Sequence, residues 1–445
     1  MLTEGSPILR DLGAGLILRC ATAADAAPLA DFVALVFRDS RSGGPDEYAV
    51  AWTRDLLRGD HPTVAVGDFT LVEDTARRRI VSAMGLIGQT WTYGGVPFGV
   101  GRPELVGTHP DYRRRGLIHA QFDIIHEWCK ERDQPVQVIS GIHWYYRQFG
   151  YELALPRNGG RTGYTPQVPI LPPGTPEPYR LRPATDDDLA FIAEVDAYGS
   201  RRSRVACTRD AALWRHQLHG YSPQSVPYRE LRVIETAAGA LVGFLAHPAE
   251  LWGPGLTATR FELQPGISWA AVTPSVVRYL DATGAAYAAR TAQPQASFTF
   301  LLGGEHPVYE VLGERLPRVL RPGTWYVRVA DLPRFLCHLA PVLESRLAES
   351  ALVGHSGELA ISFYQGGLRL TWAAGRLAAV TPWAPAWTGD GAAAFPALTF
   401  LQLLFGYRTL EELEHAFGDC WATPDARPLL HALFPKQDSD IWPVG

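Results

Sequence analysis

The residues in this sequence best suited to chemistry form an arginine-rich turn. Three consecutive arginines at 113–115 precede Gly116, between an apolar run that ends at Thr108 and a segment with helical apolar spacing. Guanidinium groups bind phosphate through charge-assisted hydrogen bonds, and the free N–H groups of a helix's first turn attract anions. A glycine at this point lets a ligand approach the backbone closely. The turn therefore predicts a polyphosphate site, with a solvated basic turn that binds nothing as the alternative.

A strand and a helix must position this turn. Residues 104–108 have the composition of a strand, and Pro110 ends it because proline has no N–H for the ladder. A helix begins near Gly116, since apolar residues recur at helical spacing from Ile118 to Cys129 and would face a sheet. The sequence thus predicts a strand–turn–helix unit with the arginines at the start of the helix.

Two features of the chain resemble the GNAT acetyltransferases. The turn matches their Arg/Gln-x-x-Gly-x-Gly/Ala motif at Arg113 and Gly116. Ile118 replaces the second small residue, and Arg-Arg-Arg-Gly-Leu followed by a bulky residue resembles the Eis-like branch of the family. About 30 residues later, 146–151 reads Tyr-Arg-Gln-Phe-Gly-Tyr and resembles the family's Tyr-x-x-x-Gly-[Phe/Tyr] element. Aromatic residues that only pack are the alternative for this second feature.

The resemblance implies an N-acetyltransferase with acetyl-CoA as acyl donor, bound where two neighbouring strands splay apart. Tyr146 is implied as the general acid, and a phenol with a pKa near 10 can protonate the leaving thiolate. Backbone groups of the strand would pair with the pantetheine arm, and N–H groups of the turn would hold the pyrophosphate. The implied cofactor-contacting residues are Val106, Gly107, Thr108, Arg113, Arg114, Arg115, Gly116, Leu117, Ile118, His119, Gly141 and Ile142.

The resemblance also implies a catalytic base. In Eis-like enzymes the carboxylate that ends the chain enters the first active site and takes the proton of the amine. This sequence ends Trp-Pro-Val-Gly, an apolar tail that we expect to dock. Gly445 is therefore expected near Tyr146, with its carboxylate facing the acceptor. The alternative is a tail packed only against its own domain. In that case the base would be a water relayed to a carboxylate such as Glu47.

The chain divides into four parts, which together predict an α/β (α+β) protein of tandem GNAT folds. We expect a catalytic GNAT domain at 1–155, a Pro/Gly-rich linker at 156–178 and a degenerate GNAT domain at 179–328, which the run 325–329 would close. The degenerate copy is inferred because 18–25 and 181–188 share a strand end, a threonine cap and an aspartate three residues later, whereas 179–325 has no Arg-x-x-Gly turn.

The remaining part, 329–445, begins with a helix and continues as a meander. Short strands are expected at 359–363, 368–372 and 377–380, an apolar helix at 395–405, and a capped helix that begins at Thr409. In Eis-like proteins the corresponding region is a sterol-carrier-like α+β domain. Near the start of the chain, the polar segment 38–47, which includes Asp39, Ser40, Ser42, Asp46 and Glu47, would border the acceptor site and could hold a cationic amine, or be a solvated loop.

Composition excludes several classes of protein. The 445 residues are 47% hydrophobic and 20% charged, with a net charge of −5, which gives no reason to expect nucleic acid or a membrane as partner. The five cysteines are dispersed, with no Cys-x-x-Cys, and no metal site is expected. Glu4 and Asp11 and the lack of a basic start argue against a signal peptide, so a cytoplasmic location is predicted.

These observations predict direct acetyl transfer to a primary amine of a small polyamine or aminoglycoside-like molecule. Two alternatives stay open: a peptide or protein amine as acceptor, and a non-catalytic binding or scaffold protein whose C-terminal domain holds an apolar ligand. A homo-oligomer is expected because a relic domain suits packing between copies, and the resemblance implies a hexamer.

Overall fold

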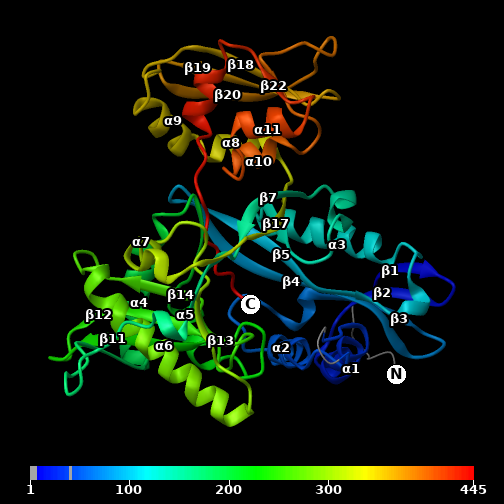
Figure 1. Cartoon of the computed structure of the whole chain (residues 1–445). Coiled ribbons are helices and arrows are strands. Elements are labelled where there is room, and N and C mark those ends of the chain that lie inside the picture. The colour runs from blue at the N-terminus through cyan, green and yellow to red at the C-terminus, as the bar shows by residue number, and fades with distance from the viewer. Residues whose placement is uncertain (1–7, 40–42) are drawn as a thin grey trace.

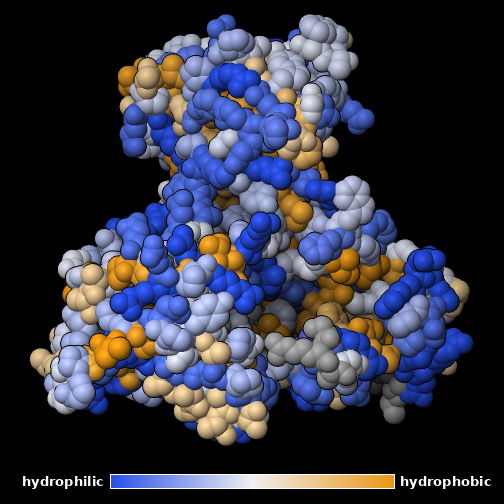
Figure 2. All heavy atoms as spheres, in the orientation of Figure 1, coloured by the Kyte–Doolittle hydropathy of each residue, from blue (hydrophilic) through white to orange (hydrophobic). Residues whose placement is uncertain are grey.

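The computed structural model describes residues 8–39 and 43–445, and these form three bodies. Figure 1 shows the first and second bodies side by side, with the third above them. Figure 2 shows a largely hydrophilic face that is hollowed between the two lower bodies. Among the described residues, no helix combines the length and apolarity needed to cross a bilayer.

The first body is built on a mixed sheet whose strands run in the order β1-β2-β3-β4-β5-β6-β17-β7, with β10 paired to β4. Their bounds are β1 Ile8–Gly13, β2 Leu16–Cys20, β3 Phe69–Asp74, β4 Arg79–Tyr93, β5 Val96–Thr108, β6 Val136–Ile139, β7 Glu152–Arg157, β10 Val205–Thr208 and β17 Gly323–Val329. The helices are α1 Ala26–Val36, α2 Glu47–Leu57 and α3 Leu117–Glu131.

Alternation along β4 places helices on both faces of this sheet. Ala83 and Ile87 belong to the core cluster of α1 and α2, whereas Met84 and Leu86 belong to that of α3. Neighbouring residues of a strand point to opposite faces, so a strand that is apolar on both sides must be covered twice. The expected strand–turn–helix unit is present as β5, the turn and α3.

The second body has two four-stranded sheets, β14-β12-β11-β9 and β13-β15-β8-β16. Its strands are β8 Gly160–Tyr164, β9 Tyr179–Pro183, β11 Glu230–Thr236, β12 Leu241–His247, β13 Gly255–Ala258, β14 Arg260–Leu263, β15 Ser297–Phe300 and β16 Arg318–Leu320. Its helices are α4 Leu189–Ser200, α5 Ala211–His219, α6 Trp269–Thr291 and α7 Pro307–Leu312.

The local pattern shared by 18–25 and 181–188 includes matching ion pairs. Arg19 binds Asp25 through both terminal nitrogens, at 2.8 and 2.7 Å, and its Nε binds Glu73 at 2.8 Å. Arg182 repeats both contacts in the second body, with Asp188 at 2.7 and 2.8 Å and with Glu235 at 3.1 Å. The same threonine-led capping box precedes α1 and α4.

The two bodies exchange strands, which differs from the expected organisation. The strand β17, expected to close the second domain, lies between β6 and β7 of the first sheet. The strand β8, expected within a spacer, lies between β15 and β16 of the second body. Glycine is needed there, because a Cβ at Gly160 would come within 2.0 Å of the Phe300 carbonyl oxygen. Where neighbouring backbones approach this closely, a strand needs glycine, and its glycines then make its sequence look like a linker.

The third body has a five-stranded sheet in the order β20-β19-β18-β21-β22. Its strands are β18 Gly357–Ser362, β19 Gly367–Ala373, β20 Arg376–Trp383, β21 Ala393–Ala394 and β22 Trp421–Ala422. Its helices are α8 Leu332–His338, α9 Ala340–Ala348, α10 Phe400–Leu404, α11 Leu410–Ala416 and α12 Arg427–Leu433. The helix expected at 395–405 is shorter, because Pro396 disfavours helical backbone at residue 395 and Ala397 has a left-handed φ of 40°, so α10 begins only at Phe400.

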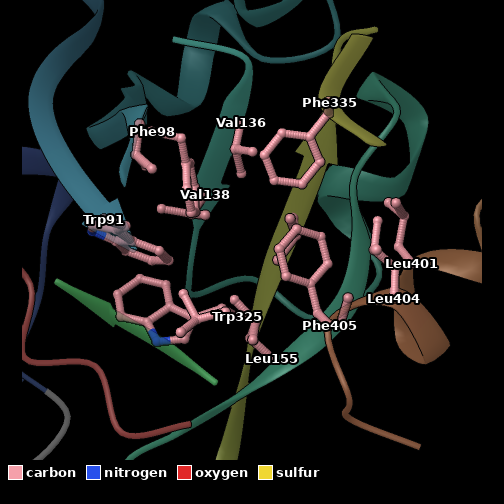
Figure 3. Packing of buried hydrophobic residues seen from close by; sticks show 14 of the residues in the cluster. Trp91, Phe98, Val136, Val138, Leu155, Trp325, Phe335, Leu401, Leu404 and Phe405 are labelled. Carbon is pink, nitrogen blue, oxygen red and sulfur yellow. The ribbon is translucent and has the colours of Figure 1, made fainter. Parts of the chain in front are cut away.

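An aromatic cluster joins the third body to the first sheet. Trp91 of β4 meets Trp325 of β17 edge to face, with ring centroids 6.4 Å apart. Phe335 of α8 contacts Phe98 of β5 at 5.3 Å and Phe405, which follows α10, at 6.0 Å. Figure 3 shows these rings facing one another. Aromatic pairs in such geometry add roughly 0.5–1.5 kcal/mol each beyond the apolar area that they bury.

Candidate active site

A cleft of about 770 Å³ opens in the first body around the arginine turn. It lies between the end of α1, the last residues of β5, the start of α3 and the segment after β6. Every sequence-predicted cofactor residue except Gly141 lines it. The others in its wall are Val36, Phe37, Arg38, Tyr112, Tyr145 and Gln148. The structure thus brings together the implied cofactor residues of β5, of the turn with the start of α3, and of the segment after β6.

The cleft exists because two parallel strands separate. The strand β5 pairs with β6 only at Val100–Val136 and Gly101–Gln137. Beyond Gly101 the strands diverge, and the ladder of β5 with β4 shifts register between Ala83 and Gly85. Leu105 has a φ of 54°, the left-handed backbone of a distorted strand. The last residues of β5 therefore have a side without a strand neighbour, where an extended ligand can bind.

The arginine turn is held by contacts within the first body. The Arg115 guanidinium carbon lies 4.7 Å from the centre of the Tyr112 ring, and its Nη2 donates to the Asp111 carbonyl at 3.0 Å. Gly116 caps α3 with a φ of 75°, and a Cβ there would meet nothing within 4 Å. The start of α3 is therefore open to the cleft, and its free N–H groups and arginines suit an anionic ligand.

Tyr146 does not line the cleft and is buried among aromatic rings, next to Tyr145, which does. It is 3% exposed, and its ring centroid is 5.5 Å from that of Tyr326. Its hydroxyl oxygen is 4.0 Å from the position that a Cβ of Gly141 would take. Burial, with a smaller contribution from the nearby Glu104 carboxylate, raises the pKa of Tyr146, so the hydroxyl keeps its proton. Tyr145, in contrast, lines the cleft itself and is half-buried.

Gly445 docks elsewhere in the first two bodies. Its main-chain oxygen accepts hydrogen bonds from His61 Nε2, at 2.8 Å, and from the Tyr221 hydroxyl. Burial lowers the pKa of His61 to about 4, so the ring is neutral and donates from Nε2. Gly445 does not line the cleft, and these partners come from the segment after α2 and from the second body. The tail docks as expected, but a catalytic role of Gly445 stays a prediction.

Glu47 also lies outside the cleft, in a second hollow of about 510 Å³ between the first two bodies. We call this the acidic hollow, because four carboxylates line it against one arginine: Asp39, Asp46, Glu47 and Glu250 against Arg229. Aromatic rings line it too, those of Tyr48, Tyr228 and Trp252. The polar segment that sequence placed at the acceptor site contributes here, although Ser40 and Ser42 lie outside the described residues.

Sequence reasoning missed a charged pair beside Tyr146. Arg102 and Glu104 alternate along β5 and pair at 2.6 Å between Nη2 and Oε1, with Arg102 only 7% exposed. Two charges spaced i and i+2 in an otherwise apolar strand share one face of the sheet. That spacing is a signal for a buried ion pair within the strand that leads to the arginine turn.

The second body has a hollow of about 590 Å³, between the end of α4, the strand β14 and the segment after β15. Its charged side chains are largely paired with one another, as in Arg202–Glu262 and Arg260–Asp440. Its described lining contains no consecutive arginines at a helix start. In the described part of the chain, no three His, Cys, Asp or Glu side chains are grouped as metal ligands.

Comparison with known proteins agrees with this geometry. Residues 18–154 match the family model described as an acetyltransferase (GNAT) domain. The mixed α/β GNAT-like fold and the prediction of an acetyltransferase enzyme are thereby confirmed, and a GNAT domain implies acetyl-CoA as substrate. A search of curated proteins found no match.

Solved structures share the fold over nearly the whole chain. A probable N-acyltransferase from Enterococcus faecalis V583 has a TM-score of 0.66 at 14% identity, covering 96% of this chain and 98% of its own. A GCN5-related N-acetyltransferase from Kribbella flavida has a TM-score of 0.64 at 17% identity, covering 97% and 98%. Eis1 from Mycobacterium abscessus has a TM-score of 0.59 at 15% identity, covering 96% and 99%.

Proposed function

We propose that this protein transfers the acetyl group of acetyl-CoA directly to a primary amine of a small cationic molecule, with Tyr146 as general acid. The observation that carries the proposal is the cleft, which joins the open start of α3 to the unpaired side of β5. A GNAT domain at 18–154 agrees with it. The arginine turn and the end of β5 both line this cleft, which suits the pyrophosphate and the pantetheine arm, and Tyr146 packs against Tyr145 of the cleft wall.

Each part of the donor has a partner in this proposal. The N–H groups from Arg114 to His119, with the arginine side chains, bind the pyrophosphate. The backbone of 106–108 pairs with the amides of the pantetheine arm, because these residues have no neighbour from β6. Gly141 and Ile142 contact the donor from the segment that follows β6. The thioester then lies near Tyr146, where β5 diverges from β6.

The transfer needs no covalent enzyme intermediate. The amine nitrogen attacks the thioester carbonyl carbon, a backbone N–H of β5 stabilises the oxyanion, and the C–S bond breaks. The thiolate takes the proton of the Tyr146 hydroxyl, which its burial among aromatic rings keeps protonated. The tyrosinate then recovers the proton that the acetylated nitrogen releases.

The acidic hollow supports a cationic acceptor. Its four carboxylates and three aromatic rings provide both ionic and cation–π contacts for ammonium groups. The Tyr48 hydroxyl donates to Glu250, so this contact joins the two bodies across the hollow. A polyamine or an aminoglycoside-like molecule has several amines at spacings that suit such a site.

A screen of amines tests the proposal and separates its alternatives. Polyamines, aminoglycosides and a lysine-containing peptide are each incubated with the protein and acetyl-CoA, and the released CoA thiol is measured. The proposal predicts turnover with the small cations well above that with the peptide. Preference for the peptide would favour a peptide or protein acetyltransferase. Absence of thiol release with every amine would favour the scaffold alternative.

We also propose a role for the remaining parts of the chain. The third body has a small sheet with helices, and we propose it as the sterol-carrier-like domain expected at 329–445. The degenerate GNAT domain expected at 179–328 is proposed to pack between copies of the chain. A homo-oligomer, with a hexamer as the first form to test, is measurable by light scattering, and a monomer at working concentration would contradict it. The structure shows no disulfide among the described cysteines, and we propose a cytoplasmic location.

A further inference from the structure

The acidic hollow contains one cation that no carboxylate neutralises. Arg229 lies just before β11, and it forms no ion pair among the described residues, although four carboxylates line the same hollow. Its Nη1 donates to the main-chain carbonyls of Val226 and Tyr228, at 3.0 and 2.5 Å, and its Nε is buried without a partner. Burial lowers the pKa of Arg229 to about 10, so the guanidinium is still charged at neutral pH. A partly buried cation without a counter-charge is costly, and an anionic group of a ligand would remove that cost.

A buried hydroxyl in the same wall also has no partner. Ser225 lines the hollow, is only 3% exposed, and its Oγ forms no hydrogen bond. The Arg229 guanidinium carbon lies 4.7 Å from the centre of the Trp252 ring, which holds the cation in one place. Buried polar groups of native proteins are hydrogen-bonded as a rule. An orphaned hydroxyl four residues from an unpaired guanidinium therefore indicates that this wall completes its hydrogen bonds with a ligand.

The wall that the first body contributes adjoins the donor cleft. Asp46 caps α2, and Glu47 follows it in the first turn without an ion pair among the described residues. The Asp46 N–H donates to the carbonyl of Phe37 at 3.1 Å, and Phe37 lines the cleft. A Cβ at Gly107 of β5 would come within 3.2 Å of the Phe37 ring. Phe37 thus contacts both the strand proposed to hold the donor and the residue that begins this acidic wall.

We propose that the acceptor is an α-amino acid with a second amine in its side chain, such as lysine or ornithine, and that Arg229 binds its α-carboxylate. This inference rests on the proposed acetyl transfer and narrows the acceptor class. The carboxylate accepts from the Arg229 guanidinium and the Ser225 hydroxyl, whereas the side-chain ammonium lies at the wall of Asp46 and Glu47, next to the donor.

The transfer then occurs on the side-chain nitrogen, because the anchored carboxylate keeps the α-amine at the wall of the second body. The side-chain ammonium first loses one proton to solvent. Its nitrogen forms the C–N bond to the acetyl carbon as the C–S bond breaks, and the thiolate takes a proton as in the proposed function. The products are the side-chain N-acetylated amino acid, free CoA thiol and one proton.

The first test uses pairs of amines that differ only in the carboxylate. Cadaverine is lysine without its carboxyl group, and putrescine is related to ornithine in the same way. Release of CoA thiol at saturating acetyl-CoA gives kcat/KM for each amine. The wild-type protein should prefer the amino acid of each pair by roughly 10–100-fold, because charge-assisted hydrogen bonds hold its carboxylate. Product analysis by NMR should place the acetyl group on the side-chain nitrogen.

Variants in the wall of the second body should change this preference. Arg229→Leu should lower kcat/KM for lysine by roughly 10–100-fold and leave that for cadaverine unchanged. Arg229→Lys keeps a cation and should retain part of the preference. Ser225→Ala removes one buried hydroxyl and should lower only the lysine value, by several-fold. If Arg229→Leu fails to fold, the wild-type comparison and Ser225→Ala still decide.

Arg201→Leu is the matched control. Arg201 also belongs to the second body, and its guanidinium carbon lies 5.8 Å from the centre of the Tyr198 ring. It lines neither the cleft nor the acidic hollow. Both amines should therefore react with this variant as they do with the wild-type protein.

The outcomes distinguish this inference from the proposed function. A wild-type kcat/KM for cadaverine equal to or above that for lysine, or an acetyl group on the α-nitrogen, would overturn the inference and leave acetyl transfer in place. Equal losses for both amines in Arg229→Leu would also overturn it, because the arginine would then only support the hollow. A wild-type protein that acetylates no amine would overturn the proposed function instead.

Discussion

At the scale of single residues, the site depends on two adjacent tyrosines with different environments. Tyr146 is buried against Tyr326 and faces Gly141, whereas Tyr145 forms part of the cleft wall. The short helix that carries them turns successive side chains in different directions, so one faces the core and the other the ligand. The buried hydroxyl keeps its proton through the neutral range, which suits an acid, while the lining ring suits a contact with the donor.

A pair of substitutions distinguishes these two roles. Tyr146→Phe removes only the hydroxyl and should lower kcat by roughly 10²–10⁴-fold, the usual weight of general acid catalysis, with little change in acetyl-CoA affinity. Tyr145→Phe should cost far less. Steady-state kinetics with the best amine of the screen measures both. A larger loss of kcat in Tyr145→Phe than in Tyr146→Phe would contradict the assignment of Tyr146 as the acid.

At the scale of elements, local pattern predicted most strands and helices but not all of their partners. The strand–turn–helix of the arginine turn, the capping boxes and the meander of the third body agree with the sequence because each depends on nearby residues. The location of β17 does not, since its apolar run Trp-Tyr-Val fits the centre of either sheet. Likewise, Arg102 and Glu104 form a buried ion pair because α2, β17 and the last residues of the chain cover Arg102.

The strand exchange predicts interdependent folding of the first two bodies. A fragment of residues 1–178 lacks β17, so β6 and β7 lose the strand between them and expose apolar edges. It should show weak near-ultraviolet dichroism and no cooperative unfolding. A fragment of residues 1–331 retains β17 and should unfold cooperatively. Similar, cooperative transitions in both fragments would show that the first body does not need β17.

At the scale of the whole molecule, the tail of the chain, residues 438–445, runs from the third body to the other two and ends in a group of imidazole and phenol rings. His61 and His216 meet with ring centroids 4.5 Å apart, and Tyr221 stacks edge-on against His216 at 4.6 Å. Burial lowers the pKa of both histidines. Neutral rings are therefore part of the docked state, and protonation opposes it.

Acid should weaken this docked state. The pKa of His61 is about 4 in the folded protein and near 6.5 when unfolded, so its stabilisation is complete above pH 6.5 and declines as the pH falls towards 4. Between pH 7 and 5 the loss is about 2 kcal/mol. Urea unfolding at both values, for wild type and His61→Gln, should show a smaller acid-induced loss in the variant. Equal losses would mean that His61 is not the titrating group.

The most direct test of the account is calorimetric titration of acetyl-CoA into the wild-type chain and into an Arg114→Ala/Arg115→Ala variant, with acetyl-pantetheine as a second ligand. Contacts of arginine with phosphate contribute about 1.5–3 kcal/mol each, so the variant should lose at least tenfold in acetyl-CoA affinity. Acetyl-pantetheine lacks the pyrophosphate, and its affinity should be nearly the same for both proteins. The account predicts one acetyl-CoA per chain, bound in the first body. Equal losses for both ligands, unchanged acetyl-CoA affinity in the variant, or no binding to the wild-type protein would contradict it.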